Sequence, residues 1–286
     1  AVTDGTYGAV GLDFKSPHTG LAAKKAWFFF DKTYVCLGTN ISSRMKNQVL
    51  TTVNQCLLNG QVTVSDADGI HPQERGSRMK KEVRWVVHDK VGYYFLNKEN
   101  VILSNQRTEG SWKIANRQTT TPTDIIQQDV FTLSVDHGSY PNNEGYAYMV
   151  VPSADPLSIE KQVEEEGVVV LANCPDVQAV RHDGLNMAYA VFYKGGTLRI
   201  HDKIVVEMDA PGMLMVKYND AGEILALGVS DPTRFMKKLH LSVNQRIVGT
   251  AQENIQTEWD GKQALTRISV DLPQNEYAGK SVIYNK

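Results

Sequence analysis

The segment AWFFFDKTYVCLG, Ala26 to Gly38, contains two runs of aromatic and β-branched residues on either side of Asp31. Such residues favour strands, because their bulky side chains pack well on a pleated surface. Similar runs recur along most of the chain between Gly, Asn, Asp or Pro residues. They include VRWVVHDKVGYYFL (83–96), GYAYMVVP (145–152), MAYAVFYKGGTLRI (187–200) and KIVVEMDAPGMLMVKYN (203–219). Short strands separated by turn residues predict antiparallel sheets and an all-β fold.

The spacing of apolar residues supports this class. Leu198 and Ile200, and then Ile204 and Val206, stand two residues apart. Successive strand residues point to opposite faces, so this spacing predicts one buried face. The segment LMVKYNDAGEILALGV (214–229) predicts a hairpin that turns at 219–222.

Helical signals occur in two segments. LSIEKQVEEEG (157–167) predicts two or three turns ended by Gly167, and DPTRFMKKL (231–239) predicts one turn after an Asp231 cap. Neither is long enough to form a helical layer. A change of pattern near DAPG (209–212) predicts a large β domain over 1–209 and a smaller one over 210–286.

The composition narrows the range of partners. The 286 residues include 30 Lys and Arg against 32 Asp and Glu, a formal charge of −2 at pH 7. Nucleic-acid binding needs a concentrated basic excess, so nucleic acid is not an expected partner. The sequence contains no apolar run of about 18 residues, so it predicts no membrane-spanning segment. AVTDGTYGAV (1–10) has neither an initial Met nor a signal peptide, so we expect a removed leader or a longer parent protein.

The segment DHGSYPNNEGYAYMVVP (136–152) is a candidate active site. It places His137 close in sequence to Tyr140, Tyr146 and Tyr148, and a His/Tyr pair can act as acid and base. The alternative is a strand, a Pro-Asn-Asn turn and a second strand whose aromatic residues pack in the core. We favour this alternative, because catalysis needs a convergence of side chains that the sequence does not provide.

Other chemical motifs are missing from the sequence. The seven histidines include no pair at i, i+2 or i, i+4, and the three cysteines include no CxxC, so no zinc site is predicted. SDADGIHPQE (65–74) lacks the spacing of an EF-hand and predicts a solvated turn, not a calcium loop. GxSxG, GxGxxG and P-loop motifs are absent as well. We therefore expect neither a metal nor another cofactor.

Three residues are candidates for contact with a polysaccharide. Trp112 follows a Gly-Ser turn, and an exposed Trp can stack on a sugar ring. Arg44 and Lys46 lie in an expected loop at 42–48, and they are candidates because the family resemblance described below implies a sulfated or uronate-containing chain as the ligand.

Several segments, in one order along the chain, resemble polysaccharide lyase family 8, which comprises the hyaluronate, chondroitin and xanthan lyases. The most specific is GLAAKKAWFFFDKTYVCLGTNIS (20–42), with small residues, two lysines, an aromatic block, Asp and then Leu-Gly. The others are VTDGTYGAVGLDF (2–14), TTVNQC (51–56), WVVHDKVGYYF (85–95), TEGSWKIAN (108–116), DHGSYPNNEGYAYMVVP (136–152) and VSDPT (229–233). The resemblance covers nearly the whole chain.

This resemblance implies a large antiparallel β-supersandwich over 1–209, with its first strands missing, and a C-terminal β-sandwich over 210–286. Family members cleave uronic acid-containing polysaccharide by β-elimination. An Asn neutralises the uronate carboxylate, and a Tyr/His pair removes the C5 proton and protonates the leaving O4. In the family these groups belong to an N-terminal α/α toroid with no matching segment here. We therefore expect no catalytic residue in this chain.

The resemblance also sets the expected role. The chain alone is expected to be inactive and to support the substrate cleft of a secreted or periplasmic lyase. Its expected partners are an acidic polysaccharide, chondroitin sulfate or hyaluronan, and the helical toroid of the same protein. The alternative is a stand-alone, non-catalytic carbohydrate-binding module with a similar fold.

Overall fold

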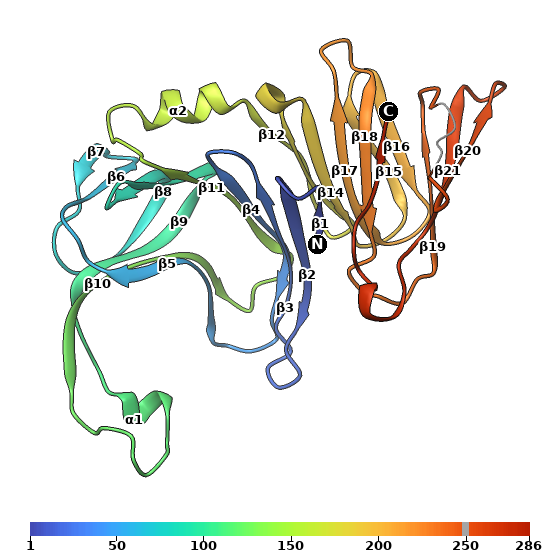
Figure 1. Cartoon of the computed structure of the whole chain (residues 1–286). Helices are drawn as coiled ribbons and strands as arrows, with labels where there is room; N and C mark the ends of the chain where they lie inside the picture. The colour runs from blue at the N-terminus through green and yellow to red at the C-terminus, as the bar shows by residue number, and fades with distance from the viewer. Residues whose placement is uncertain (248–251) are drawn as a thin grey trace. The chain divides into compact units, whose positions relative to one another are not determined.

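The computed structural model describes residues 1–247 and 252–286 and confirms the all-β class (Figure 1). The helices in this part of the chain are short: α1 (Trp112–Ala115), α2 (Ile159–Glu166) and two 3-10 turns, Asp183–Leu185 and Asn275–Tyr277. Neither α-helix has the length and apolar character needed to cross a membrane. The strands form two compact units. Unit 1 comprises 1–44, 142–147 and 160–286, and unit 2 comprises 45–141 and 148–159.

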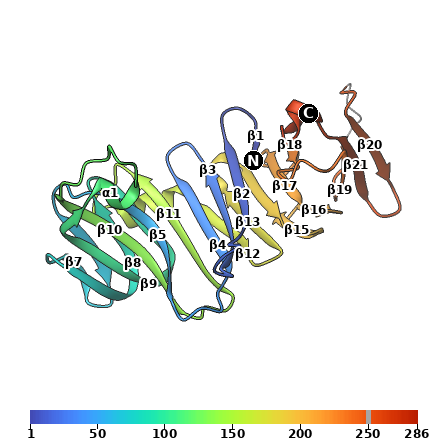
Figure 2. The same ribbon diagram turned by 90° about the horizontal axis from the view of Figure 1, so that it is seen from below.

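Unit 1 contains a sandwich of two antiparallel sheets. The first has the order β12 (Val168–Asn173), β13 (Val177–His182), β14 (Met187–Phe192), β17 (Gly212–Tyr218), β18 (Ile224–Ser230) and β22 (Val282–Asn285). The second sheet, whose strands are labelled in Figure 2, has the order β15 (Gly196–His201), β16 (Ile204–Met208), β19 (Lys238–Val243), β21 (Leu265–Asp271) and β20 (Ile255–Asp260).

One apolar core joins these two sheets. It includes the predicted inward-facing residues Leu198, Ile200, Ile204 and Val206, all at most 6% exposed. The predicted hairpin at 219–222 is confirmed, because β17 and β18 pair in antiparallel register on either side of it. The core takes residues from both sides of position 209. The division of the chain at 209/210 stays a prediction.

A second layer covers the other face of the six-stranded sheet. Strands β1 (Val2–Thr3), β2 (Gly8–Lys15), β3 (Ala22–Phe29) and β4 (Tyr34–Ser42) contact β12, β14, β17 and β18. The rings of Phe28 and Tyr189 lie 6.3 Å apart between the layers. Gly11 approaches so closely that an added Cβ would lie 2.6 Å from Cγ1 of Val191. The six-stranded sheet is therefore buried on both faces, which explains why β14 is buried at every residue.

Unit 2 is built around the long strand β9 (Val91–Gly110). One side of β9 pairs with β8 (Ser77–His88), followed by β6 (Val62–Asp66) and β7 (Gly69–Pro72). The C-terminal half of β9 pairs with β10 (Ile126–Ser139), and β10 also pairs with β5 (Gln48–Leu57). The first residues of β9 pair with the end of β11 (Glu144–Pro152). The tip of the β9–β10 hairpin carries α1 and projects from the other strands of unit 2 (Figure 1).

The helical expectations had different outcomes. Helix α2 ends before Gly167, which has a φ of +61°, as predicted. The segment after Asp231 forms the predicted turn with Asp231 as its cap, although this turn is not part of a helix. The Asp231 carboxylate accepts the backbone N–H groups of Thr233, Phe235 and Met236 and so replaces the bonds a helical turn would supply. Helix α1 was not predicted from the sequence.

A buried carboxylate ties the β6–β7 hairpin to β8. The side chain of Asp66 is 4% exposed, and its oxygens lie 3.0 Å from Nζ of Lys80 and 3.1 Å from Nε2 of His71. Burial alone would raise the pKa of Asp66, but the hydrogen bonds from Lys80 and His71 outweigh burial and lower it. The charged form is therefore part of the folded structure.

Replacing Gly11 by Ala should lower the free energy of unfolding by about 1–3 kcal/mol, because the added methyl overpacks the layer against Val191. Denaturant unfolding followed by tryptophan fluorescence measures this loss. The matched control is Gly196→Ala in β15, where no heavy atom lies within 4 Å of the added Cβ. Adding Val191→Ala to Gly11→Ala should recover part of the loss. Equal losses at Gly11 and Gly196 would contradict the packing argument.

Replacing Asp66 by Asn should cost about 1.5–3 kcal/mol of unfolding free energy at pH 7, because charge-assisted hydrogen bonds are lost. The folded pKa of Asp66 lies below its unfolded value of about 3.9, so the contribution is present above that value. It is lost as the pH falls through the folded pKa. The difference between wild type and variant should therefore shrink below about pH 4. Asp68→Asn, an exposed neighbour, is the control, and a pH-independent difference at Asp66 would refute this account.

Candidate functional site

The segment 136–152 forms the predicted strand, turn and strand, not an exposed acid/base site. β10 ends at Ser139 and β11 begins at Glu144. His137 is 8% exposed, and its Nε2 lies 2.9 Å from Oγ1 of Thr51. Tyr146 and Tyr148 are buried, and burial raises the pKa of Tyr146 far above its ordinary value. Tyr146 instead packs over Gly38, where a Cβ would overlap its ring. The strand–turn–strand interpretation is confirmed, but one of its aromatic residues does not pack in the core: Tyr140 in the turn region is 56% exposed.

A Cys–His pair in unit 2 was not predicted from the sequence. Sγ of Cys56 lies 3.7 Å from Nδ1 of His88, and Nε2 of His88 lies 3.0 Å from the backbone N of Asn59. Because that backbone group donates to Nε2, the proton of the neutral ring sits on Nδ1 and faces the sulfur. The histidine therefore cannot take the thiol proton. Burial also raises the pKa of Cys56 and lowers that of His88, so the pair stays neutral.

The acidic segment 65–74 does not bring its carboxylates together into a group suited to a metal ion. Ala67 and Asp68 form the predicted exposed turn, whereas the side chain of Asp66 beside them is buried and paired with Lys80 and His71. The expectation that this segment is not an EF-hand was based only on the spacing of its acidic residues in the sequence. Across the described residues, no three His, Cys, Asp or Glu side chains form a group suited to a metal ion.

The three predicted sugar-contacting residues are placed as follows. Arg44 and Lys46 are exposed in the bend between β4 and β5, and neither makes a hydrogen bond or ion pair within the described residues. Trp112 begins α1 and is 60% exposed, beside the exposed Ile114. The side chain of Ser111 accepts the backbone N–H of Lys113 and so fixes the start of this helical turn. No hydrogen bond or cation–π contact joins Arg44, Lys46 and Trp112.

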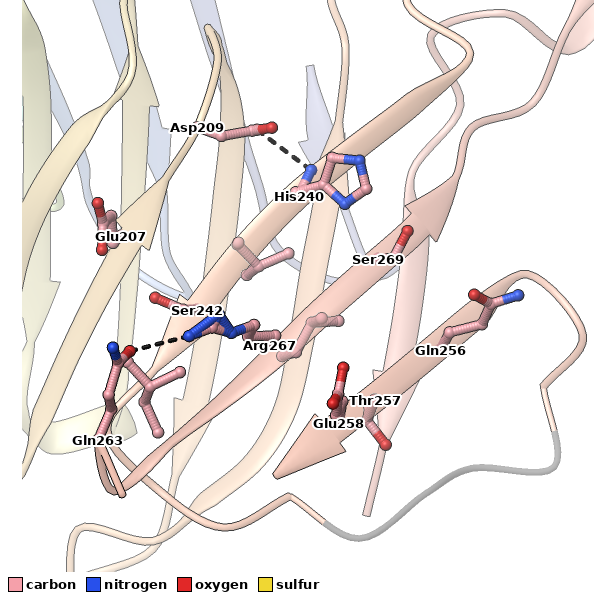
Figure 3. A pocket seen from close by; sticks show the side chains of 13 residues that line it. Glu207, Asp209, His240, Ser242, Gln256, Thr257, Glu258, Gln263, Arg267 and Ser269 are labelled. Carbon is pink, nitrogen blue, oxygen red and sulfur yellow. Dashed lines mark hydrogen bonds between the residues drawn. The ribbon is translucent and has the colours of Figure 1, made fainter. Parts of the chain in front are cut away.

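A pocket of about 650 Å³ lies on the outer face of the five-stranded sheet (Figure 3). Two rows of side chains cross it, because residues paired across neighbouring strands share a face. Glu207, Ser242, Arg267 and Glu258 form one row over β16, β19, β21 and β20. His240, Ser269 and Gln256 form the second row, over β19, β21 and β20. We call this set of seven residues the polar groove.

Arg267 is held in place at the groove. Its Nη2 lies 3.0 Å from Oδ2 of Asp260 and 2.9 Å from Oε1 of Gln263. Across the groove, the backbone N of His240 lies 3.2 Å from Oδ1 of Asp209, as Figure 3 shows. Glu207 and Glu258 make no hydrogen bond or ion pair within the described residues. The groove therefore offers fixed donors and unoccupied acceptors, and no Phe, Tyr or Trp stands among its described lining residues.

No motif revealed the polar groove, because its residues are spread over positions 207–269 and become neighbours through strand order. The usable signal was the alternation in each strand, which puts polar residues on the face opposite the core. That signal identifies an outer face but not which strands lie side by side.

Comparisons with known proteins agree with this fold. Residues 1–163 match the super-sandwich domain of polysaccharide lyase family 8, and residues 169–240 match the C-terminal beta-sandwich domain of that family. The chain is 36% identical over 284 residues to a chondroitinase-AC of Pedobacter heparinus, covering 98% of this chain and 37% of that protein. It is 29% identical over 283 residues to a hyaluronate lyase of Thermasporomyces composti, covering 97% of this chain and 35% of that protein.

A solved structure gives the same result. A chondroitinase AC lyase superposes with a TM-score of 0.83 at 35% identity, over 99% of this chain and 39% of that one. The chain thus spans less than two fifths of the length of these relatives. Two domain models of one family match in order, and one relative is 36% identical over nearly the whole chain. This chain belongs to polysaccharide lyase family 8.

Proposed function

We propose that the chain is the β-domain part of a glycosaminoglycan lyase that cleaves chondroitin or hyaluronan chains by β-elimination. The observation that carries this proposal is the 36% identity to a chondroitinase-AC over 98% of the chain. The chain spans 37% of that relative, so the remaining part of such a protein has room for the catalytic groups. The enzyme is proposed to be secreted or periplasmic, where it meets polysaccharide.

The proposed reaction needs groups that meet a uronate ring. A neutralised carboxylate makes the C5 proton acidic, a base removes it, and an acid protonates the leaving O4, which yields a 4,5-unsaturated uronide. His137 is buried, and the ring of His88 presents its proton to Cys56. These features support the proposal that the acid and base lie in an α/α toroid outside this chain.

An exposed apolar surface supports the proposed helical partner. On the face of β2 and β3 away from β14, Val10, Leu12, Phe14 and Phe29 are 38–43% exposed. Contiguous exposed apolar residues mark surfaces that contact another domain or protein. We propose that this face packs against the toroid.

Arg44, Lys46 and Trp112 are proposed to contact the polysaccharide. Arg44 and Lys46 are exposed cations without partners in the described residues, which suits sulfate and uronate groups. Trp112 presents an exposed ring that suits stacking on a sugar.

The chain alone should produce no unsaturated uronide from chondroitin sulfate or hyaluronan, because it is proposed to lack the acid and base. The rise in ultraviolet absorbance of the unsaturated product measures turnover. A longer protein from the same gene, containing the proposed toroid, is the positive control. Turnover by residues 1–286 would refute the proposed division of roles, and a longer protein without turnover would contradict the proposed lyase activity.

Replacing Arg44 and Lys46 together by Gln should weaken binding of chondroitin sulfate oligosaccharides and reduce its dependence on salt, because two charge contacts are lost. Trp112→Ala should weaken binding by about 2–10-fold without changing the salt dependence, because stacking contributes about 0.5–1.5 kcal/mol. Titration calorimetry at several salt concentrations measures both effects.

The control for Trp112 is Tyr277→Ala, which removes a ring of similar exposure, 61% against 60%. Unchanged affinity in the Arg44/Lys46 and Trp112 variants would remove these residues from the proposed binding surface. A stand-alone binding module is the alternative, and it is supported if no longer protein from the gene cleaves glycosaminoglycan.

A further inference from the structure

We infer that the polar groove is a binding site for an uncharged, hydroxyl-rich saccharide. This inference goes beyond the proposed function, because the ligand it names is not the anionic polysaccharide proposed as the substrate of the lyase. The volume of about 650 Å³ lies within the roughly 300–1,000 Å³ typical of small-ligand sites.

The arrangement of donors and acceptors suits sugar hydroxyls, which both donate and accept. Arg267 is fixed through Nη2 alone, so its Nε–H and Nη1–H remain available within the described residues. The carboxylates of Glu207 and Glu258 accept without having a partner in that part of the chain. Charge-assisted hydrogen bonds of this kind are about twice as strong as neutral ones. Gln256, Ser242 and Ser269 add neutral groups between the charged ones.

The charges in the groove disfavour an anionic ligand. Glu207, Asp209 and Glu258 carry three negative charges against the single positive charge of Arg267 in the lining. A sulfated or uronate-rich segment would therefore meet net repulsion. The net charge of the groove is therefore negative, opposite to that of the exposed cations Arg44 and Lys46.

Other ligand classes fit less well. Glu207 and Glu258 lie three strand spacings apart, about 14 Å, so they cannot share one metal ion. Leu241 and Ile268 in the lining are buried and Leu265 is partly exposed, so most of the exposed side chains of the lining are polar, which does not suit a lipid or a hydrophobic peptide. The fixed guanidinium of Arg267 between Ser242 and Glu258 opposes a basic peptide lying across the row.

The test uses the full chain and neutral hexasaccharides of glucose, mannose, galactose and xylose, titrated by calorimetry. At least one should bind and protect backbone amides of β16, β19, β20 and β21 from hydrogen exchange. Arg267→Gln and Glu258→Gln should each weaken that binding by about tenfold or more, because each removes a charge-assisted hydrogen bond.

The matched controls are Lys238→Gln and Asp271→Asn. They remove one cation from β19 and one carboxylate from β21, which form an exposed ion pair at 3.2 Å outside the groove lining. Both should leave the affinity unchanged, and thermal unfolding midpoints check that all four variants fold.

Three results would overturn the inference. One is that no neutral hexasaccharide binds, and another is that all four variants bind equally well. The third is that hexalysine or a chondroitin sulfate hexasaccharide binds the groove in place of the neutral sugars and is sensitive to Glu258→Gln or Arg267→Gln. Turnover of soluble chondroitin by the longer protein is measured separately. If the groove fails these tests but the longer protein cleaves chondroitin, the groove inference is wrong and the proposed lyase function is still supported.

Discussion

The arrangement of unit 1 depends on one sheet being buried on both faces. The six-stranded sheet has the five-stranded sheet on one side and β1–β4 on the other. Its central strand β14 consequently has no polar face: Ala188 and Ala190 pack into the sandwich core, while Tyr189 meets Phe28 of the second layer. The central strand of such a sheet offers no solvent-facing side chains, so the broad faces of unit 1 that are open to a ligand are the outer faces of the covering layers.

Those two outer faces differ in chemistry. The face of β2 and β3 away from β14 exposes Leu12 and Phe14, whereas the outer face of the five-stranded sheet carries the polar groove. The first suits contact with another protein domain, and the second suits a hydrated ligand. Burying one face of each covering sheet against the central sheet leaves the other face free to acquire its own function.

Three titratable groups inside unit 2 are committed to structure. Nε2 of His137 lies beside Thr51, the backbone of Asn59 donates to His88, and the hydrogen bonds to Asp66 hold a hairpin. Each of these groups has a specific partner, and a catalytic cycle would have to break the contact with that partner. These contacts give each of the three groups a structural role in the folded chain.

The sequence alone determined the all-β class, the inward alternation at Leu198 and Ile200, and the strand–turn–strand nature of 136–152, because these follow from local periodicity and turn residues. Motif order also indicated the family. Only the tertiary structure decided that Asp66 is paired and buried, and that Glu207, Arg267 and Glu258 share one face. Those neighbours come from strands far apart in the chain, and strand order depends on long-range packing that no local pattern records.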